Sequence, residues 1–152
     1  TYRGVKQKII PVSIELELSQ TSNADSEYMK TNLTTDTRKE FARKLEDTVI
    51  RDSLYLLPKL SMEDLQNRVG IPKHNLSEVL NNELHMNFYE YINRLRIQSF
   101  QDRIRKGEHK QFTILSIALD SGFSSKASFN RTFKTFTGST PSEFVRSVDS
   151  AN

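Results

Sequence analysis

The spacing of hydrophobic residues changes near residue 36 and divides the chain into two parts. Between residues 10 and 18, apolar side chains alternate with polar ones, the period-two pattern of a half-buried strand. Residues 19–32 are polar, and the sequence offers no sheet that such a strand could join. We therefore predict an extended or flexible tail over residues 1–35. The alternative is a tail that pairs with another chain or with upstream sequence.

From residue 36 onward the hydrophobic period is that of α-helices. Phe41, Leu45 and Val49 recur every four residues among charged neighbours. This spacing predicts an amphipathic helix that runs to about Leu57, just before Pro58.

The next segment has the pattern of a helix, a tight turn and a second helix. Ser61 is a good N-cap with Asp64 three residues on, and Gly70 is suited to end this short helix. Pro72 suits the first position of the following helix. The buried stripe of that helix is predicted to be Leu76, Val79 and Leu80. This arrangement is typical of a helix-turn-helix unit.

A long helix is predicted after Asn87, whose side chain can cap it. Glu90, three residues later, can complete a capping box by accepting from the Asn87 N–H. Its apolar residues fall into two sets, as if the helix served two separate cores. The first set is Phe88, Tyr91, Ile92 and Leu95, and the second is Ile97, Phe100 and Ile104.

The helix-turn-helix pattern then returns about 52 residues later, since Gly122 occupies the place that Gly70 has in the first unit. Thr113 is the expected N-cap of the first helix of this copy, and Thr140 with Glu143 offers a capping box for a last helix that begins with a proline. The side chains predicted to face inward on the second helix are Phe129, Phe133 and Phe136.

The outer side of the second helix of this copy is strongly basic and polar. At helical spacing it carries Lys126, Asn130, Arg131 and Lys134, while the small Ala127 and Ser128 allow close approach to a partner. The major groove of DNA, about 12 Å wide, admits one such helix. The linker helix of roughly 18 residues would separate the units by about 27 Å, compared with a DNA turn of about 34 Å. This geometry predicts two reading helices on one face of a duplex.

The composition agrees with DNA binding and excludes some other classes of protein. The net charge is +3 and the pI is about 9.2, a mild preference for acidic partners such as nucleic acid. The chain has no cysteine, which excludes disulfides and thiolate sites and fits a reducing cytoplasm. No apolar run approaches the roughly 20 residues of a membrane span, so we expect a soluble, cytoplasmic chain without membrane contact of its own.

Candidate chemistry for catalysis is absent from the sequence. The three histidines, His74, His85 and His109, lack metal-ligand spacing, and there is no glycine-rich phosphate loop or nucleophile motif. We therefore expect neither an enzyme nor a bound metal or cofactor. A helical protein-interaction module, with its basic face bound to an acidic partner, is the alternative to DNA binding.

The sequence resembles the DNA-binding domain of the AraC-type (arabinose-regulator) transcription factors over residues 55–146. The resemblance is carried by "LSMEDLQNRVGIPKHNLSEVLNNELHMNFYEYINRLRI" and by "ILSIALDSGFSSKASFNRTFKTFTGSTPSEFV", with its Ile-Ala, Gly-Phe, Phe-x-x-x-Phe-Lys and Gly-x-Thr-Pro order. Two positions depart from the family pattern. His85 stands in place of a turn glycine, and it tolerates a left-handed conformation better than most residues. Phe100 replaces a usual alanine, which we expect to change core packing.

The resemblance implies an all-α domain of about seven helices that binds consecutive major grooves of a promoter and recruits RNA polymerase. Over residues 36–152 we expect a first unit at 55–86, a linker helix at 87–106 and a second unit at 112–147. The chain begins at Thr1 rather than Met and resembles the cytoplasmic part of membrane-anchored or sensor-fused members. Tethering to the inner face of the membrane, and self-association through the tail or an upstream region, stay open.

Transfer of the family's base-reading positions to this sequence gives one set of residues on each second helix. The residues are His74, Ser77 and Glu78 in the first unit, and Lys126, Ala127, Asn130 and Arg131 in the second. Glu78 could accept from a cytosine amino group or could be a solvated residue that meets no base. Arg131 could fork onto guanine, or could form a structural ion pair with Asp120.

Backbone phosphates are the expected targets of a second set of residues. These are Ser61, Lys73, Arg94, Arg96, Thr113 and Lys134. Ser61 and Thr113 are included because free N–H groups at helix N-termini suit anions. For Arg94 and Arg96 the alternative is an ordinary solvated charge.

Overall fold

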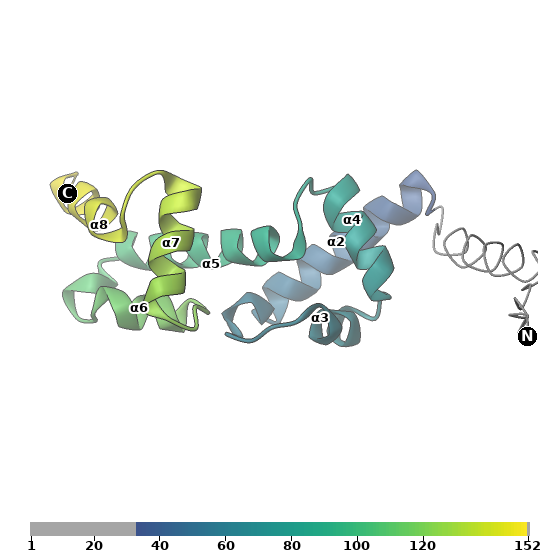
Figure 1. The fold of residues 1–152 in the computed structure, drawn as a ribbon, viewed down its shortest axis with the longest axis horizontal. Coiled ribbons are helices and arrows are strands. Elements are labelled where there is room, and N and C mark those ends of the chain that lie inside the picture. The colour runs from purple at the N-terminus through teal and green to yellow at the C-terminus, as the bar shows by residue number, and fades with distance from the viewer. Residues whose placement is uncertain (1–32, 152) are drawn as a thin grey trace, which may run out of the picture. The chain divides into compact units, whose positions relative to one another are not determined.

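The computed structural model describes residues 33–151, and the tail predicted for residues 1–35 therefore lies almost wholly outside the described residues. Within this part the chain is helical without strands, as predicted (Figure 1). The helices are α2 (Thr35–Arg51), α3 (Met62–Val69), α4 (Lys73–Asn82), α5 (Phe88–Arg105), α6 (Ile114–Asp120), α7 (Lys126–Thr137) and α8 (Pro141–Ser150), with 3-10 helices η1 (Leu54–Leu56) and η2 (Glu108–Lys110). None of them is long and apolar enough to cross a membrane.

Helix α2 begins where the sequence predicts but ends six residues early. It stops at Arg51 instead of about Leu57, because Ser53 adopts a left-handed conformation with φ of 50° and the chain turns into η1. The turn buries Leu54, which is only 2% exposed. Burial of one leucine in tertiary structure thus outweighs the local preference for a longer helix.

The first helix-turn-helix unit has the predicted caps and core. The Ser61 N–H donates to the Asp64 carboxylate at 2.9 Å, and the Asp64 N–H donates to the Ser61 hydroxyl at 3.1 Å. Gly70 ends α3 in a left-handed conformation with φ of 73°, and Leu76, Val79 and Leu80 are buried in α4. Pro72 is the N-cap of α4 and not its first helical residue, one position from the prediction.

A non-glycine residue makes the turn after α4. His85 has a φ of 53°, in the left-handed region that a glycine would occupy without strain. The predicted tolerance of histidine at this position is therefore confirmed.

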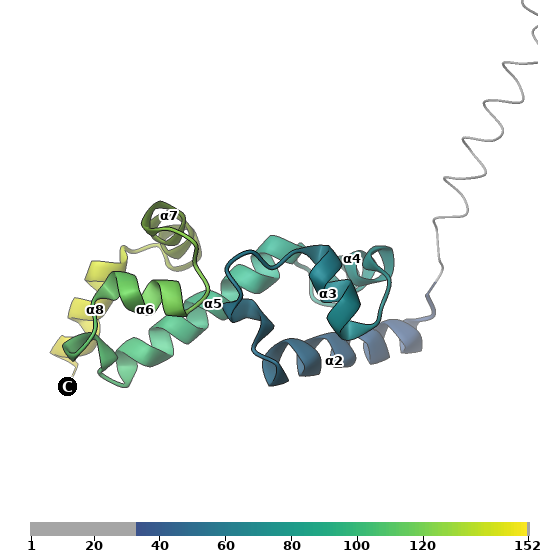
Figure 2. The same cartoon turned by 90° about the horizontal axis from the view of Figure 1, so that it is seen from below.

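Helix α5 serves two cores, as its two apolar sets predict. Tyr91 and Ile92 are buried in its first half, and Ile97, Phe100 and Ile104 join the core of the second unit. In Figure 2 the helix runs from beside α4 to beside α6 and α8. Its start has the expected capping box, with the Asn87 N–H donating to Glu90 at 2.8 Å and the Glu90 N–H donating to Asn87 at 3.0 Å.

The second core is a cluster of phenylalanine rings. The Phe100 ring lies 4.7 Å from that of Phe129 and 5.5 Å from that of Phe133, so this departure from the family pattern lies within the core. Phe123 and Phe144 belong to the same cluster, with their rings 5.1 Å from that of Phe129 and 5.7 Å from that of Phe133, respectively. The inward prediction for Phe136 is wrong, because its side chain is 40% exposed. The core is already filled from one helical turn earlier by Phe133.

The capping boxes give a testable pH dependence of stability. Hydrogen bonds from the Ser61 hydroxyl and N–H lower the pKa of Asp64, and those from Thr140 lower the pKa of Glu143. Each carboxylate therefore stabilises the fold above its ordinary pKa of about 4. This contribution is lost as the pH falls through the lower folded-state value. We expect the melting temperature to drop less between pH 5 and pH 3 in an Asp64→Asn, Glu143→Gln double variant. Equal drops in wild type and variant would contradict this.

Candidate functional site

The outward face of α4 carries two of the three predicted base-reading residues of the first unit in accessible positions. His74 is exposed and Ser77 is half-buried, while Leu76 and Leu80 on the opposite face fix the helix against the core. Lys73, at the start of α4, is exposed, and its N–H donates to the Gln66 side chain of α3 at 2.8 Å. The N-terminal half of α4 is thus both anchored and open to a partner.

Glu78 is not free on this face. Arg38 of α2 lies with its Nη1 3.5 Å from Glu78 and its Nε 3.1 Å from Glu83. The ion pair agrees with neither sequence interpretation of Glu78, which were a base reader and a solvated residue. Arg38 was missed because its partners lie 40 and 45 residues away, and no local pattern marks such a pair.

The outward face of α7 is a continuous polar surface of exposed side chains. Its members are Lys126, Ala127, Asn130, Arg131 and Lys134. Phe129 and Phe133 on the opposite side are buried and hold the helix in place, and Ser125 caps it by accepting from the Ser128 N–H at 3.2 Å. The structure thus brings all the sequence-predicted residues of α7 onto one face.

The alternative prediction for Arg131, an ion pair with Asp120, is wrong. Asp120 lies 3.5 Å from Nη2 of Arg103, whose Nε also contacts Glu108 at 2.6 Å. Arg131 forms no ion pair with any described residue, so its guanidinium stays free for a partner. The role of Arg103, which joins α5 to η2 and α6, was not predicted from the sequence.

A groove of about 350 Å³ lies beside α7. Lys126 and Asn130 line it together with Thr113 and Ser142, from the first turns of α6 and α8. Thr113 accepts from the Ser116 N–H at 3.0 Å and has no acidic residue in the first turn of its helix. The surroundings of Thr113 therefore differ from those of Ser61, the other helix N-terminus predicted to bind a phosphate.

Ser61 does not fit a phosphate site. Its hydroxyl donates to the Asp64 carboxylate at 2.6 Å, and the first turn of α3 carries Glu63 and Asp64. These two negative charges would repel a phosphate at the N-terminus, where the helix dipole alone would attract one. The prediction that Ser61 contacts phosphate is not supported by its environment.

Arg96 is half-buried and bound to main-chain carbonyls of the segment that follows α2. Its Nε donates to the carbonyl of Tyr55 at 2.8 Å, and its Nη2 donates to the carbonyl of Leu57 at 2.7 Å. The guanidinium also lies 6.0 Å from the ring centre of Phe123. Burial lowers the pKa of Arg96, although an arginine stays charged. These contacts fit neither a phosphate ligand nor a solvated charge.

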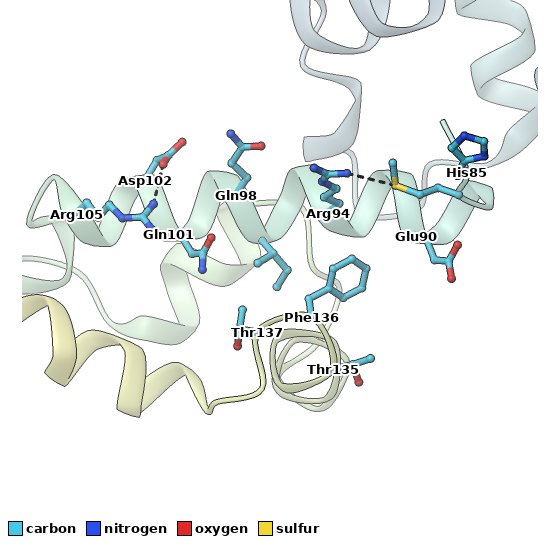
Figure 3. A pocket seen from close by; sticks show the side chains of 12 residues that line it. His85, Glu90, Arg94, Gln98, Gln101, Asp102, Arg105, Thr135, Phe136 and Thr137 are labelled. Carbon is cyan, nitrogen blue, oxygen red and sulfur yellow. Dashed lines mark hydrogen bonds and ion pairs between the residues drawn. The ribbon is translucent and has the colours of Figure 1, made fainter. Parts of the chain in front are cut away.

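Arg94, in contrast, is one of the residues that line a wide groove of about 1100 Å³ (Figure 3). Its Nη1 is 3.9 Å from the sulfur of Met86, and its side chain is exposed. Phe136 points from α7 into the same groove, toward α5, which accounts for its exposure. Arg94 is therefore available to an anion, whereas Arg96 is not. Among the described residues, no cluster of side chains could hold a metal ion.

Comparison with known proteins places these features in a family. A family model described as a helix-turn-helix domain matches residues 65–147. An uncharacterised HTH-type transcriptional regulator of Staphylococcus aureus (strain COL) is 36% identical over 91 residues, which are 60% of this chain and 12% of that protein. A probable transcription factor of Proteus vulgaris, PqrA, is 29% identical over 85 residues, which are 56% of this chain and 67% of that protein.

Solved structures show the same fold. A transcriptional regulator of Chromobacterium violaceum, with an AraC-type DNA-binding domain, superposes with a TM-score of 0.58 at 23% identity. The superposition covers 70% of this chain and 92% of that one. A protein of unknown function from Listeria innocua superposes with a TM-score of 0.53 at 25% identity, covering 64% of this chain and 95% of that one. The match to the Staphylococcus aureus regulator spans only 12% of its length.

Proposed function

The chain belongs to the AraC-type helix-turn-helix family, and on that premise we propose that it is a transcriptional regulator that binds promoter DNA. Helices α4 and α7 would enter consecutive major grooves and read sequence there. The observation that carries the proposal is the outward face of α7, where cationic and amide side chains surround an alanine and are all exposed.

The composition of this face favours DNA over other anionic surfaces. A major groove presents donors, acceptors and thymine methyl groups within the reach of one helix. Arg131 would donate two hydrogen bonds to guanine O6 and N7, Asn130 would pair with adenine, and Ala127 would contact a thymine methyl. Lys126 would complete the reading set at the start of α7. A face bound to an acidic protein would need charge but no such combination of amide and methyl contacts.

In the first unit, α4 would read with fewer residues. His74 and Ser77 are accessible, whereas Glu78 would have to leave Arg38 before it could accept from a cytosine amino group. We therefore propose that α4 contributes less to base discrimination than α7 does. For the phosphate contacts we keep Lys73, Arg94 and Lys134, which are exposed, and Thr113 as a neutral donor.

We further propose the extent of the domain and its partners. The domain would span residues 36–152, with a first unit at 55–86, a linker helix at 87–106 and a second unit at 112–147. RNA polymerase and a second copy of the chain are candidate partners at a promoter, and the site of action would be the cytoplasm. No catalytic step is proposed. The second candidate function is binding of an acidic protein partner, favoured only by the same basic face.

Selection from a randomised DNA library at two salt concentrations tests this proposal. We expect enrichment of a motif with two blocks about one helical turn apart. If roughly six phosphates are neutralised, the log–log salt slope of binding should be near −5. Binding without an enriched motif would leave only a non-specific DNA contact. Absence of binding, or a flat salt response, would contradict the proposal and favour the acidic protein partner.

A further inference from the structure

The two helix-turn-helix units meet at a junction built around Arg96. This arginine lies near the middle of α5, between the residues that pack into the two cores. Its guanidinium donates to two main-chain carbonyls of the segment that follows α2, at Tyr55 and Leu57. Figures 1 and 2 both show that segment next to the turn between α6 and α7. Arg96 therefore ties the first unit to the helix that carries the second.

The turn of the second unit is pressed against the same place. A Cβ atom added at Gly122 would lie 2.3 Å from the carbonyl oxygen of Tyr55, 2.8 Å from Nε of Arg96 and 3.1 Å from Cα of Leu56. Gly122 also has a φ of 101°, which other residues rarely adopt. The guanidinium of Arg96 lies over the ring of Phe123, the next residue. The main chain of the first unit, at residues 55–57, and that of the second unit, at Gly122, thus both pack against the Arg96 side chain.

DNA geometry gives this junction a functional consequence. One base pair adds about 3.4 Å along the duplex axis and about 35° of rotation. A protein that reads two blocks must hold its reading helices to better than one such step if it is to accept a single spacing. A continuous α5 limits the distance between the units, and hydrogen bonds beside its axis add a restraint on their rotation.

We infer that Arg96 is a positioning residue that fixes the distance and rotation between α4 and α7, and so selects the spacing between the two blocks of the DNA site. The inference rests on the proposed DNA-reading function. Arginine suits the role because its planar fork donates to two acceptors at once, which a lysine ammonium on a flexible stem does far less well. The half-buried setting strengthens these charge-assisted hydrogen bonds.

The first experiment uses the free protein and needs no DNA. The chain has no natural cysteine, so spin labels can be placed at Asn82→Cys on α4 and Thr135→Cys on α7. We expect a narrow distribution of label distances that broadens or shifts in Arg96→Met and in Arg96→Lys. The control is Arg43→Met, which removes an exposed α2 arginine and should leave the distribution unchanged. Circular dichroism establishes that each variant keeps its helices.

The second experiment varies the spacer between the two selected DNA blocks by one and two base pairs. Wild type should prefer one spacer by about tenfold or more, because a wrong spacer costs at least one base contact. In Arg96→Met and Arg96→Lys this preference should fall severalfold while the sequence preference within each block is kept. If Arg96 instead contacted a phosphate, Arg96→Lys should bind DNA nearly as well as wild type. Arg96→Met should then lower the log–log salt slope of binding by about one and leave the spacer preference unchanged.

The outcomes separate the inference from the proposed function. A broad wild-type distance distribution would overturn the inference without any variant, and so would an unchanged distribution in folded Arg96→Lys. If Arg96→Met fails to fold, Arg96→Lys decides, since it keeps the charge and the aliphatic stem. Absence of any selected motif would count against DNA reading, while the label distances would still report whether Arg96 holds the units together.

Discussion

Replacement of Phe100 by alanine is expected to lower the free energy of unfolding by about 3–5 kcal/mol. The side chain is 0% exposed, and its ring packs against those of Phe129 and Phe133. Truncation would leave a cavity between α5 and α7 that these rings could fill only in part. Urea denaturation followed by circular dichroism measures the loss.

Phe112→Ala is the matched control for this change. Phe112 is 52% exposed, so the same truncation there should change stability by no more than about 0.5 kcal/mol. A loss below about 1 kcal/mol in Phe100→Ala would show that the second core does not depend on this ring. Because Phe129 and Phe133 also position the outward face of α7, loss of the Phe100 ring should weaken DNA binding as well.

Replacement of Arg131 by alanine is expected to weaken DNA binding by about 1–3 kcal/mol, or roughly fivefold to 150-fold. The arginine is exposed on α7 and forms no ion pair with a described residue, so the change should cost little stability. One position of the selected motif should lose its preference for guanine. Library selection with the variant, beside equilibrium binding to the wild-type motif, gives both quantities.

Arg131→Lys separates base reading from simple charge. A lysine keeps the positive charge but cannot donate the paired hydrogen bonds that recognise guanine O6 and N7. We expect Arg131→Lys to lose the guanine preference while it keeps more of the affinity than Arg131→Ala. If Arg131→Ala left the motif unchanged and lowered only the salt slope, Arg131 would be a phosphate contact.

Features set by neighbouring residues could be predicted from the sequence. The N-cap at Ser61 and the capping boxes at Asn87 and Thr140 formed as expected, because each involves a partner three residues away. The end of α2 could not be predicted in this way. It depends on the burial of Leu54 against residues distant in sequence, and no helix-ending signal precedes Asp52.

The same distinction applies to the candidate site. The polar face of α7 follows from helical spacing alone, and its Lys126, Arg131 and Lys134 side chains form no ion pair with a described residue. The environments of Glu78 and Arg96 depend on Arg38, Tyr55 and Leu57, at least 39 residues away in the chain. A charged residue on a helix surface looks the same in sequence whether it faces solvent or a distant main-chain carbonyl.

The division of α5 between two cores also bears on how the protein unfolds. If one unit lost its structure, half of α5 would lose its packing, and a helix of 18 residues is only marginally stable without tertiary support. The free energy of either unit therefore depends on the other, although each has its own buried residues. Amide protons in the middle of α5 should consequently exchange with solvent only when the whole helical domain opens.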